Sequence, residues 1–191
     1  MWEESFYQSG KFARCPYDYI ASFVFRNAPP KARNEVRILE VGCGSGNNTW
    51  FLSQEGFACC GTDAAPSAIN YAKARCGPAC DFRLAEFPHI PFPEDHFDLA
   101  FDRAAICYTN FETASLAIEN VRRALRGAGR FLFTPYSFHK AAGMIGLGYT
   151  EEMIRRILSR WRIVDIQKAT FEDFQRNQVL WSEWRVTAEK V

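Results

Sequence analysis

Residues 36–46 read Val-Arg-Ile-Leu-Glu-Val-Gly-Cys-Gly-Ser-Gly, and the fold follows from this stretch. The first six residues are mainly apolar and half of them are β-branched, which is typical of a buried strand. Glycine in the turn that follows permits positive φ angles and lets the backbone approach a ligand closely. Residues 47–55 then predict a short helix, which Gly56 ends. A strand, a glycine-rich turn and a helix in this order predict the first unit of an α/β fold.

Strands and helices continue to alternate beyond this first unit. Further strands are expected at residues 57–63, 80–86, 97–102 and 129–134. Helices are expected to open at Pro66, at a capping box formed by Thr109 and Glu112, and at Thr150. Residues 162–171 and 180–190 are both strand-like with only a short loop between them, so they should pair antiparallel. The sequence therefore predicts a Rossmann-like three-layer α/β/α sandwich, with a mostly parallel seven-stranded sheet and an antiparallel C-terminal strand.

The first 35 residues differ in character from the rest. Aromatic residues alternate with charged ones there, and a short helix is expected at about residues 17–26, ended by Ala28-Pro29-Pro30. We therefore divide the chain into an N-terminal helical or lid segment, residues 1–35, and a core, residues 36–191. The aromatic side chains of the segment could close over a ligand or simply pack on the outer helices.

The composition is that of one soluble globular domain of 191 residues, 48% hydrophobic and 24% charged. Basic and acidic residues nearly cancel, at 23 against 22, so neither a nucleic acid nor a membrane is expected as a partner. No apolar run approaches the roughly 20 residues of a bilayer span. Met1-Trp2-Glu3-Glu4 does not open a secretory signal, so we expect a cytoplasmic protein. The sequence leaves the oligomeric state open.

The cysteines indicate reduced thiols rather than a disulfide framework or a metal site. There are seven of them: Cys15, Cys43, Cys59, Cys60, Cys76, Cys80 and Cys107. Their odd count, and an adjacent pair inside an apolar run, favour free thiols. Cys76 and Cys80 enclose three residues, but no second Cys or His pair follows at the spacing of a zinc finger. No metal is expected.

The glycine-rich turn has an acidic partner, Asp63, at the end of the next expected strand. A carboxylate there can accept both hydroxyls of a ribose, which favours a nucleoside-containing cofactor over a plain tight turn. The dinucleotide fingerprint Gly-x-Gly-x-x-Gly is not met, because Gly46 falls one position early. Glu40 would repel a pyrophosphate but would attract the ammonium of S-adenosylmethionine, which has no phosphate.

With these features the chain resembles the class I S-adenosylmethionine-dependent methyltransferases over nearly all of residues 36–191. The matching stretches are residues 39–46, 61–63, 86–92, 97–102 and 123–133. One departure is Gly127-Ala128-Gly129, where the family usually has Pro-Gly-Gly. The resemblance implies S-adenosyl-L-methionine as cofactor and S-adenosyl-L-homocysteine as product.

The resemblance also implies roles for individual residues. Glu40 would lie near the ammonium, Asp63 on the ribose, and Glu86 at the adenine amino group. The complete expected cofactor-binding set is Arg14, Glu40, Gly42, Cys43, Gly44, Asp63, Ala64, Glu86, Phe87 and Asp102. Arg14 could reach the methionine carboxylate, and Asp102 should face the methyl group. Two alternatives remain open: Glu86 as a solvated loop charge, and Asp102 as the cap of a turn at the strand end.

Methyl transfer to an oxygen acceptor also requires removal of a proton, for which Asp102 and His139 are the candidates. His139 could equally be an ordinary surface histidine. The fourth strand is not followed by Asn-Pro-Pro-Tyr, the motif of methyltransferases that act on amide or nucleobase nitrogens. The expected acceptor contacts are Tyr7, Arg103, Tyr108 and Tyr136. Arg103 favours an anionic group such as a carboxylate, although a surface salt bridge would also explain it.

The expected function is methyl transfer to a small-molecule acceptor, by O- or N-methylation of a metabolite. Two alternatives are an NAD(P)-dependent Rossmann oxidoreductase and a non-catalytic S-adenosylmethionine-binding module. The first conflicts with Glu40 and with the early third glycine, Gly46.

Overall fold

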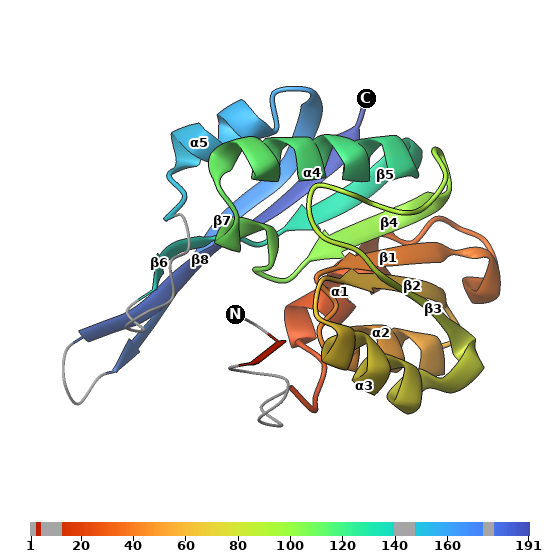
Figure 1. Cartoon of the computed structure of the whole chain (residues 1–191). Helices are drawn as coiled ribbons and strands as arrows, with labels where there is room; N and C mark the ends of the chain where they lie inside the picture. Colours follow the sequence, from red (N-terminus) through yellow and green to blue (C-terminus); the bar gives the residue numbers. More distant parts are fainter. Residues whose placement is uncertain (1–2, 5–12, 140–147, 174–177) are drawn as a thin grey trace.

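The computed structural model describes residues 3–4, 13–139, 148–173 and 178–191. Within these ranges one mixed sheet of eight strands lies between helices, in the strand order β3-β2-β1-β4-β5-β8-β6, with β7 also paired to β8 (Figure 1). The parallel part consists of β1 (Arg37–Val41), β2 (Ala58–Asp63), β3 (Cys80–Leu84), β4 (Phe97–Asp102) and β5 (Leu125–Phe133). The antiparallel part consists of β6 (Tyr136–His139), β7 (Trp161–Asp173) and β8 (Gln178–Lys190). The helices are α1 (Asp18–Asn27), α2 (Asn47–Gln54), α3 (Pro66–Cys76), α4 (Phe111–Ala124) and α5 (Glu151–Ile157).

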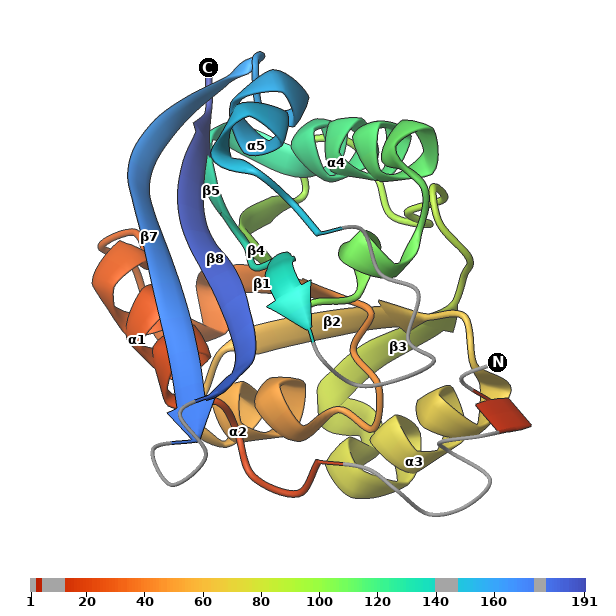
Figure 2. The same cartoon turned by 90° about the vertical axis from the view of Figure 1, so that its left-hand side faces the viewer.

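Alternate residues of the parallel strands are buried against different helices. Leu39 of β1 and Ala100 of β4 belong to a core cluster with residues of α4 and α5. Ile38 and Leu99, one position earlier on the same strands, belong to a second cluster with residues of α1 and α2. A third cluster joins Phe82 of β3 to α3. The sheet is therefore covered on both faces, which confirms the predicted three-layer sandwich (Figures 1 and 2).

Parallel pairing aligns the carboxyl ends of β1, β2 and β4 at one edge of the sheet. Glu40 of β1 lies opposite Gly61 of β2 and Phe101 of β4. Asp102, the last residue of β4, lies opposite Val41. Open α/β sheets bind their ligands outside these carboxyl ends, and the expected acidic residues lie there.

The helix α1 is part of the core rather than of a separate segment. Its residues Ile20, Phe23 and Val24 are buried in the same cluster as β1 and β4. At its first turn the guanidinium of Arg185, from β8, lies 4.0 Å from the ring centroid of Tyr19. The division at residue 35 therefore cuts through a continuous core, and only the chain before α1 remains as a candidate lid.

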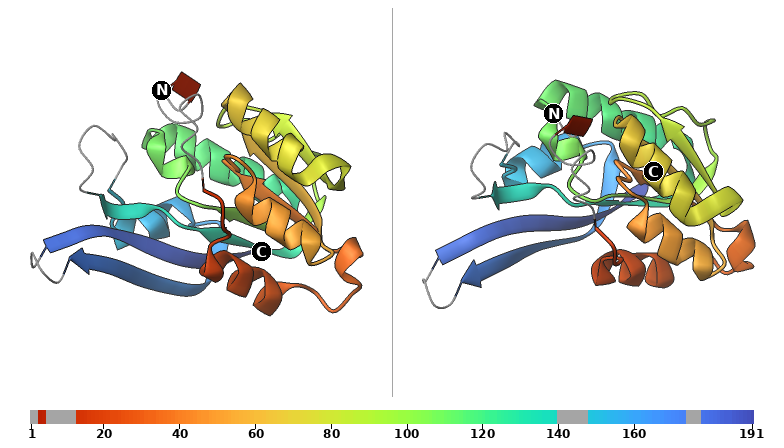
Figure 3. Two further views of the ribbon diagram at one scale, coloured as in Figure 1. Left: turned by 90° about the horizontal axis from the view of Figure 1, so that it is seen from below. Right: turned by 60° about the horizontal axis from the view of Figure 1, so that its bottom comes forward.

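The antiparallel end has one strand more than predicted. β8 pairs with β5 through residues 186–189 and with β6 through residues 181–183. β7 pairs with β8 over nearly its whole length, so that the two strands form a ribbon extending past the parallel strands (Figure 3). The prediction of seven strands is wrong because β6 has only four residues and a register shift, too few to show an alternating pattern.

One of the two predicted helix caps is correct. Thr150 accepts the backbone N–H of Met153 at 3.2 Å and so caps α5, as expected. The cap of α4 is Asn110, whose side chain accepts the N–H of Thr113 at 2.8 Å. Thr109 instead donates its hydroxyl to the carbonyl of Ile106, so the capping box predicted at Thr109 is wrong.

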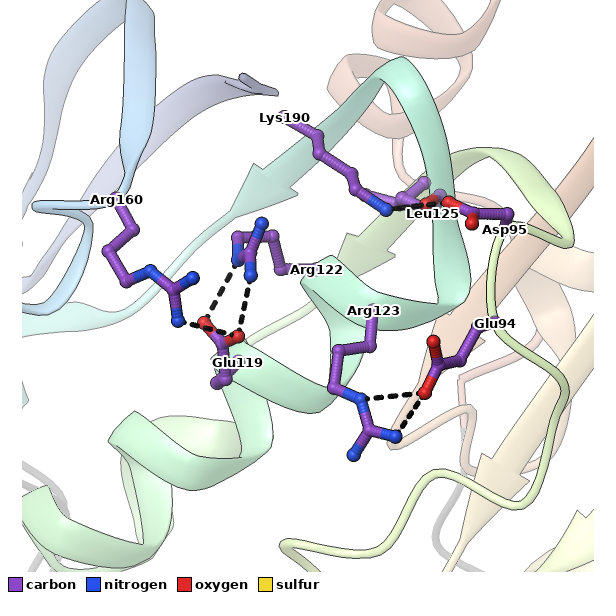
Figure 4. Close-up of polar contacts among 8 residues, drawn as sticks. All are labelled: Glu94, Asp95, Glu119, Arg122, Arg123, Leu125, Arg160 and Lys190. Atoms are coloured by element: carbon purple, nitrogen blue, oxygen red, sulfur yellow. Dashed lines mark hydrogen bonds and ion pairs between the residues drawn. The ribbon is translucent and has the colours of Figure 1, made fainter.

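Surface ion pairs gather at the edge of the sheet opposite the carboxyl ends (Figure 4). Glu119 of α4 pairs with Arg122 and with Arg160, which precedes β7. Lys190, at the end of β8, pairs with Asp95, which precedes β4. Exposed pairs of this kind contribute about 0–1 kcal/mol each, so they fasten neighbouring elements only weakly.

The state of the cysteines and the character of the helices agree with the expectations from the sequence. All seven cysteines are free, and four of them are buried. Within the described ranges no helix has the length and apolar character needed to cross a membrane.

Candidate active site

A cavity of about 550 Å³ opens at the carboxyl ends of β1, β2 and β4. This volume is within the range of cofactor and small-molecule sites, about 300–1,000 Å³. It is lined by the ends of β1 and β2 with the turns that follow them, the first turn of α2, the loops after β3 and β4, the start of β6 and the chain just before α1. The lining includes Ala13, Tyr17, Glu40, Gly42, Cys43, Gly44, Ser45, Asn47, Asn48, Asp63, Ala64, Glu86, Phe87, Arg103, Ala105, Tyr108 and Tyr136.

The turn after β1 requires glycine. Gly42 has a φ of 68°, and a Cβ atom there would lie 2.1 Å from the Cβ of Ala105. Gly46, at φ 71°, opens α2. Because Ala105 belongs to the loop after β4, the turn after β1 and that loop are in direct contact and form one wall of the cavity.

Asp63 holds the turns that surround it. Its Oδ2 accepts the N–H of Gly44 at 2.8 Å, and its Oδ1 accepts the N–H of Ala65 at 2.9 Å. Burial raises the pKa of Asp63, and these backbone hydrogen bonds oppose that rise. Each carboxylate oxygen can accept a further hydrogen bond, so Asp63 remains suited to the two hydroxyls of a ribose.

Glu40 is a buried carboxylate at the bottom of the cavity, 2% exposed. Its Oε1 accepts the side-chain N–H of Asn48 at 2.8 Å, and its Oε2 accepts the backbone N–H of Thr49 at 3.2 Å. Burial raises the pKa of Glu40 to about 7, although the hydrogen bonds from Asn48 and Thr49 lower it. Among the described residues no cation pairs with it, so a ligand ammonium would supply the missing charge.

The adenine end expected from the sequence is more open. Glu86, Phe87 and Ala64 all line the cavity, as do Gly42, Cys43 and Gly44. Glu86 and Ala64 are exposed, whereas Phe87 is half-buried. Glu86 is thus both a solvated loop charge and a lining residue.

The chain before α1 is tied to the first turn of α2. Asn47 donates its side-chain N–H to the carbonyl of Cys15 at 2.7 Å, and Ser45 donates its hydroxyl to the carbonyl of Ala13 at 3.2 Å. Asn48 accepts the backbone N–H of Tyr17 at 2.9 Å. We call residues 13–17 the strap. Arg14 lies within the strap but is exposed and absent from the cavity lining, unlike its neighbour Ala13.

The residues that hold the strap were not predicted from the sequence. Asn47, Asn48 and Ser45 are buried and line the cavity. The available signal was the pair of asparagines in the first turn of a helix, since asparagine is a poor helix former and has to be stabilised by contacts there.

Asp102 is completely buried and is not among the residues that line the cavity. Its Oδ1 accepts the backbone N–H of Ala105 at 2.9 Å and of Ile106 at 3.0 Å. Burial raises its pKa to about 6, against the effect of these hydrogen bonds. Asp102 therefore caps the turn after β4 through its Oδ1, and its expected roles at the cofactor and as a base stay predictions.

The opposite end of the cavity is cationic and aromatic. The guanidinium of Arg103 lies 4.2 Å from the ring centroid of Tyr17, and its Nη1 donates to the hydroxyl of Tyr136 at 3.0 Å. The rings of Tyr108 and Tyr136 meet edge to face at 6.1 Å. Arg103, Tyr108 and Tyr136 thus come together as expected, and we call them, with Tyr17, the acceptor end.

For two of the expected site residues the structure describes no side chain. Tyr7 lies outside the described residues. His139 ends β6, where its backbone pairs with Trp181 of β8, and only its backbone is described.

Comparison with known proteins finds methyltransferases. A family model described as a methyltransferase domain matches residues 38–129. An uncharacterized methyltransferase of Bacillus subtilis is 28% identical over 110 residues, covering 56% of this chain and 43% of the relative. The malonyl-[acyl-carrier protein] O-methyltransferase of Paenibacillus is 30% identical over 158 residues, covering 72% of this chain and 54% of the relative. The chain therefore spans about half the length of these curated relatives.

A crystal structure described as a S-adenosylmethionine-dependent methyltransferase from Methanosarcina mazei superposes with a TM-score of 0.74. It is 17% identical, and the match covers 93% of this chain and 99% of that one, so it shows a shared fold. The fold and the family model define the class, a methyltransferase domain built on one mixed, mostly parallel sheet. The chain belongs to the class I S-adenosylmethionine-dependent methyltransferases, and the oxidoreductase alternative is set aside.

Proposed function

We propose that this protein transfers a methyl group from S-adenosylmethionine to a small-molecule acceptor. One observation carries the proposal: a single cavity joins Glu40 and Asp63, suited to a cationic nucleoside cofactor, with an acceptor end built around Arg103.

The residues of the cavity fit the cofactor. Glu40 is a buried carboxylate with no cationic partner among the described residues, which suits an ammonium. Asp63 keeps acceptor capacity for ribose hydroxyls. When bound, S-adenosylmethionine supplies an electrophilic methyl group on a sulfonium. The chain's own part is to hold the two ligands in line and to exclude water, which in favourable cases accounts for much of a rate acceleration.

A small acceptor is favoured because the acceptor end lies inside the cavity. Tyr17, Tyr108 and Tyr136 surround Arg103 there, and a nearly balanced charge, net +1, does not favour a nucleic acid as partner. The name of the Paenibacillus relative describes O-methylation, which supports an oxygen acceptor over a nitrogen one.

The test uses the purified full chain in two steps. Calorimetric titration should show saturable binding of S-adenosylhomocysteine and none of NAD. Incubation with methyl-labelled S-adenosylmethionine and a panel of metabolites should then release label into at least one small molecule. Binding of NAD alone would overturn the proposal. Binding of S-adenosylhomocysteine with no transfer to any panel member would instead favour the non-catalytic module.

A further inference from the structure

Arg103 is a cation inside the cavity without an anionic partner. Among the residues that the structure describes, no carboxylate lies within ion-pair distance of it, and its Nε is buried with no hydrogen-bond partner. Its Nη1 is held by Tyr136 and its guanidinium plane lies over Tyr17, so the side chain is fixed in place. Arg103 is half-buried, and a cation partly removed from water with no anion beside it points to a ligand.

The other groups at the acceptor end are poor bases. Burial raises the pKa of both Tyr108 and Tyr136, so their phenols stay protonated at neutral pH and act as hydrogen-bond donors. No described residue of the lining is a histidine. The lining carboxylates are Glu40, Asp63 and Glu86, which belong to the expected cofactor end. Among the described residues of the lining, an acceptor that must lose a proton would find no base outside the expected cofactor end.

We infer that the acceptor is a carboxylate, and that Arg103 binds it for methylation at a carboxyl oxygen. A carboxylate is already deprotonated at neutral pH, because its ordinary pKa is near 4, and it needs no base. Its charge matches Arg103, which lines the cavity and whose guanidinium can donate to one carboxylate oxygen while the other faces the methyl group. The apolar and aromatic lining suits a body that is flat or apolar.

The proposed step balances without a proton. The carboxylate oxygen forms a bond to the methyl carbon, the carbon–sulfur bond of the sulfonium breaks, and its electron pair stays on sulfur. A methyl ester and S-adenosylhomocysteine result. The ester has lost the negative charge that Arg103 binds, so product should bind more weakly than substrate, which favours release.

This inference rests on the proposed methyltransferase function. Separate measurements of S-adenosylhomocysteine binding and of carboxylate binding test the two independently. The protein is first saturated with S-adenosylhomocysteine and then titrated with benzoate, phenylacetate and decanoate, each beside its neutral amide. The carboxylates should bind and the amides should bind at least about tenfold more weakly, since hydrogen bonds to charged groups are worth about 1.5–3 kcal/mol.

Variants of Arg103 give the second readout. Arg103→Gln should lower carboxylate affinity by about 10- to 100-fold, and Arg103→Lys should lower it less, since lysine keeps the charge but not the planar donor geometry. Affinity for S-adenosylhomocysteine should stay within about twofold in both. Arg26→Gln, on the exposed face of α1, is the matched control and should change neither affinity.

Three outcomes are decisive. Failure to bind S-adenosylhomocysteine would overturn the methyltransferase proposal itself. Normal binding of S-adenosylhomocysteine with no preference for carboxylates over amides would overturn the carboxylate inference alone, as would an Arg103→Gln variant that binds carboxylates as tightly as the original protein. With methyl-labelled cofactor, mass spectrometry should detect a methyl ester of a bound acid; an amine or alcohol product in its place would also overturn the inference.

Discussion

The two ends of the cavity are built in different ways. At the cofactor end, both oxygens of Glu40 and of Asp63 accept hydrogen bonds from neighbouring turns. At the acceptor end, Arg103 is held by rings and one hydroxyl, and its Nε has no partner. The cofactor end is therefore preorganised by the fold, whereas the acceptor end is complete only with a ligand. This difference predicts which substitutions should affect one end and which should affect both.

The largest effect is expected from Gly42→Val, which should damage both ends. A left-handed φ and a Cβ contact of 2.1 Å with Ala105 force the turn after β1 away from the loop that carries Arg103. The free energy of unfolding should fall by about 2–5 kcal/mol, and affinity for S-adenosylhomocysteine by more than about 100-fold. Denaturant unfolding and calorimetry measure the two quantities.

Gly127→Ala is the matched control for Gly42→Val, because a Cβ at Gly127 meets nothing within 4 Å. It should leave cofactor affinity unchanged. A Gly42→Val protein with normal affinity would show that the contact with the loop after β4 does not shape the cavity.

Asp63→Ala should affect the cofactor end alone. The variant removes the acceptor of the Gly44 and Ala65 N–H groups together with the expected ribose contact. Affinity for S-adenosylhomocysteine should fall by about 10- to 100-fold, because hydrogen bonds to a charged group are lost. Calorimetry measures this loss, with benzoate affinity in the absence of cofactor as the readout of the other end. An equal loss at both ends would contradict the separation of the two.

Titration of Glu40 should give a smaller, pH-dependent effect. Burial raises its pKa to about 7 from an ordinary value of 4.5, so the folded protein holds this proton more tightly than the unfolded chain. The stabilising contribution of the proton is therefore complete below about pH 4.5 and is lost as pH rises through about 7. Binding an ammonium requires the ionised form, so affinity for S-adenosylhomocysteine should rise about tenfold from pH 6 to pH 8.

Glu40→Gln separates this titration from other pH effects. The variant should bind S-adenosylhomocysteine more weakly, with an affinity that does not change between pH 6 and pH 8. Calorimetry of both proteins at pH 6, 7 and 8 measures it. A flat profile for the original protein would mean that Glu40 does not meet the ammonium.

The cofactor end could be predicted from the sequence because its determinants are local. Strand, glycine turn, helix and the acidic end of the next strand all fall within residues 36–63, and the fold places Glu40 and Asp63 as expected. Asp102 shows the limit of what the local sequence can predict. A carboxylate at a strand end can point to a ligand or cap the next turn, and only the path of residues 103–106 decides, here in favour of the cap.

The acceptor end and the strap could be predicted only in part. Arg103 and its tyrosines were identified, but their partner Tyr17 was not. The hydrogen bonds of Ser45 and Asn47 reach 32 residues back along the chain, and Asn48 reaches 31. Contacts at such separation depend on how α1 packs on the sheet, which a periodic pattern does not reveal. His139 was expected to act as a base because it comes just after the fifth strand, but it is the last residue of the extra strand β6.

The smallest effect is expected from Asn48→Ala, and it should connect the two ends. Asn48 donates to Glu40 at the cofactor end and accepts the N–H of Tyr17, whose ring supports Arg103. Loss of these two hydrogen bonds, one to the Glu40 carboxylate and one neutral, acts on each ligand only through Glu40 or Tyr17, so affinity for both S-adenosylhomocysteine and benzoate should fall by about threefold to tenfold. Calorimetry with each ligand in turn measures the two losses.

Arg160→Gln gives the matched comparison for Asn48→Ala, since it removes an exposed ion pair with Glu119 at the far edge of the sheet (Figure 4). Its free energy of unfolding should change by less than about 1 kcal/mol, and neither ligand affinity should change. If Asn48→Ala weakens S-adenosylhomocysteine but leaves benzoate binding as it is in Arg160→Gln, the strap serves the cofactor alone. If both affinities fall together, the strap is the physical connection through which the preorganised cofactor end also orders the acceptor end.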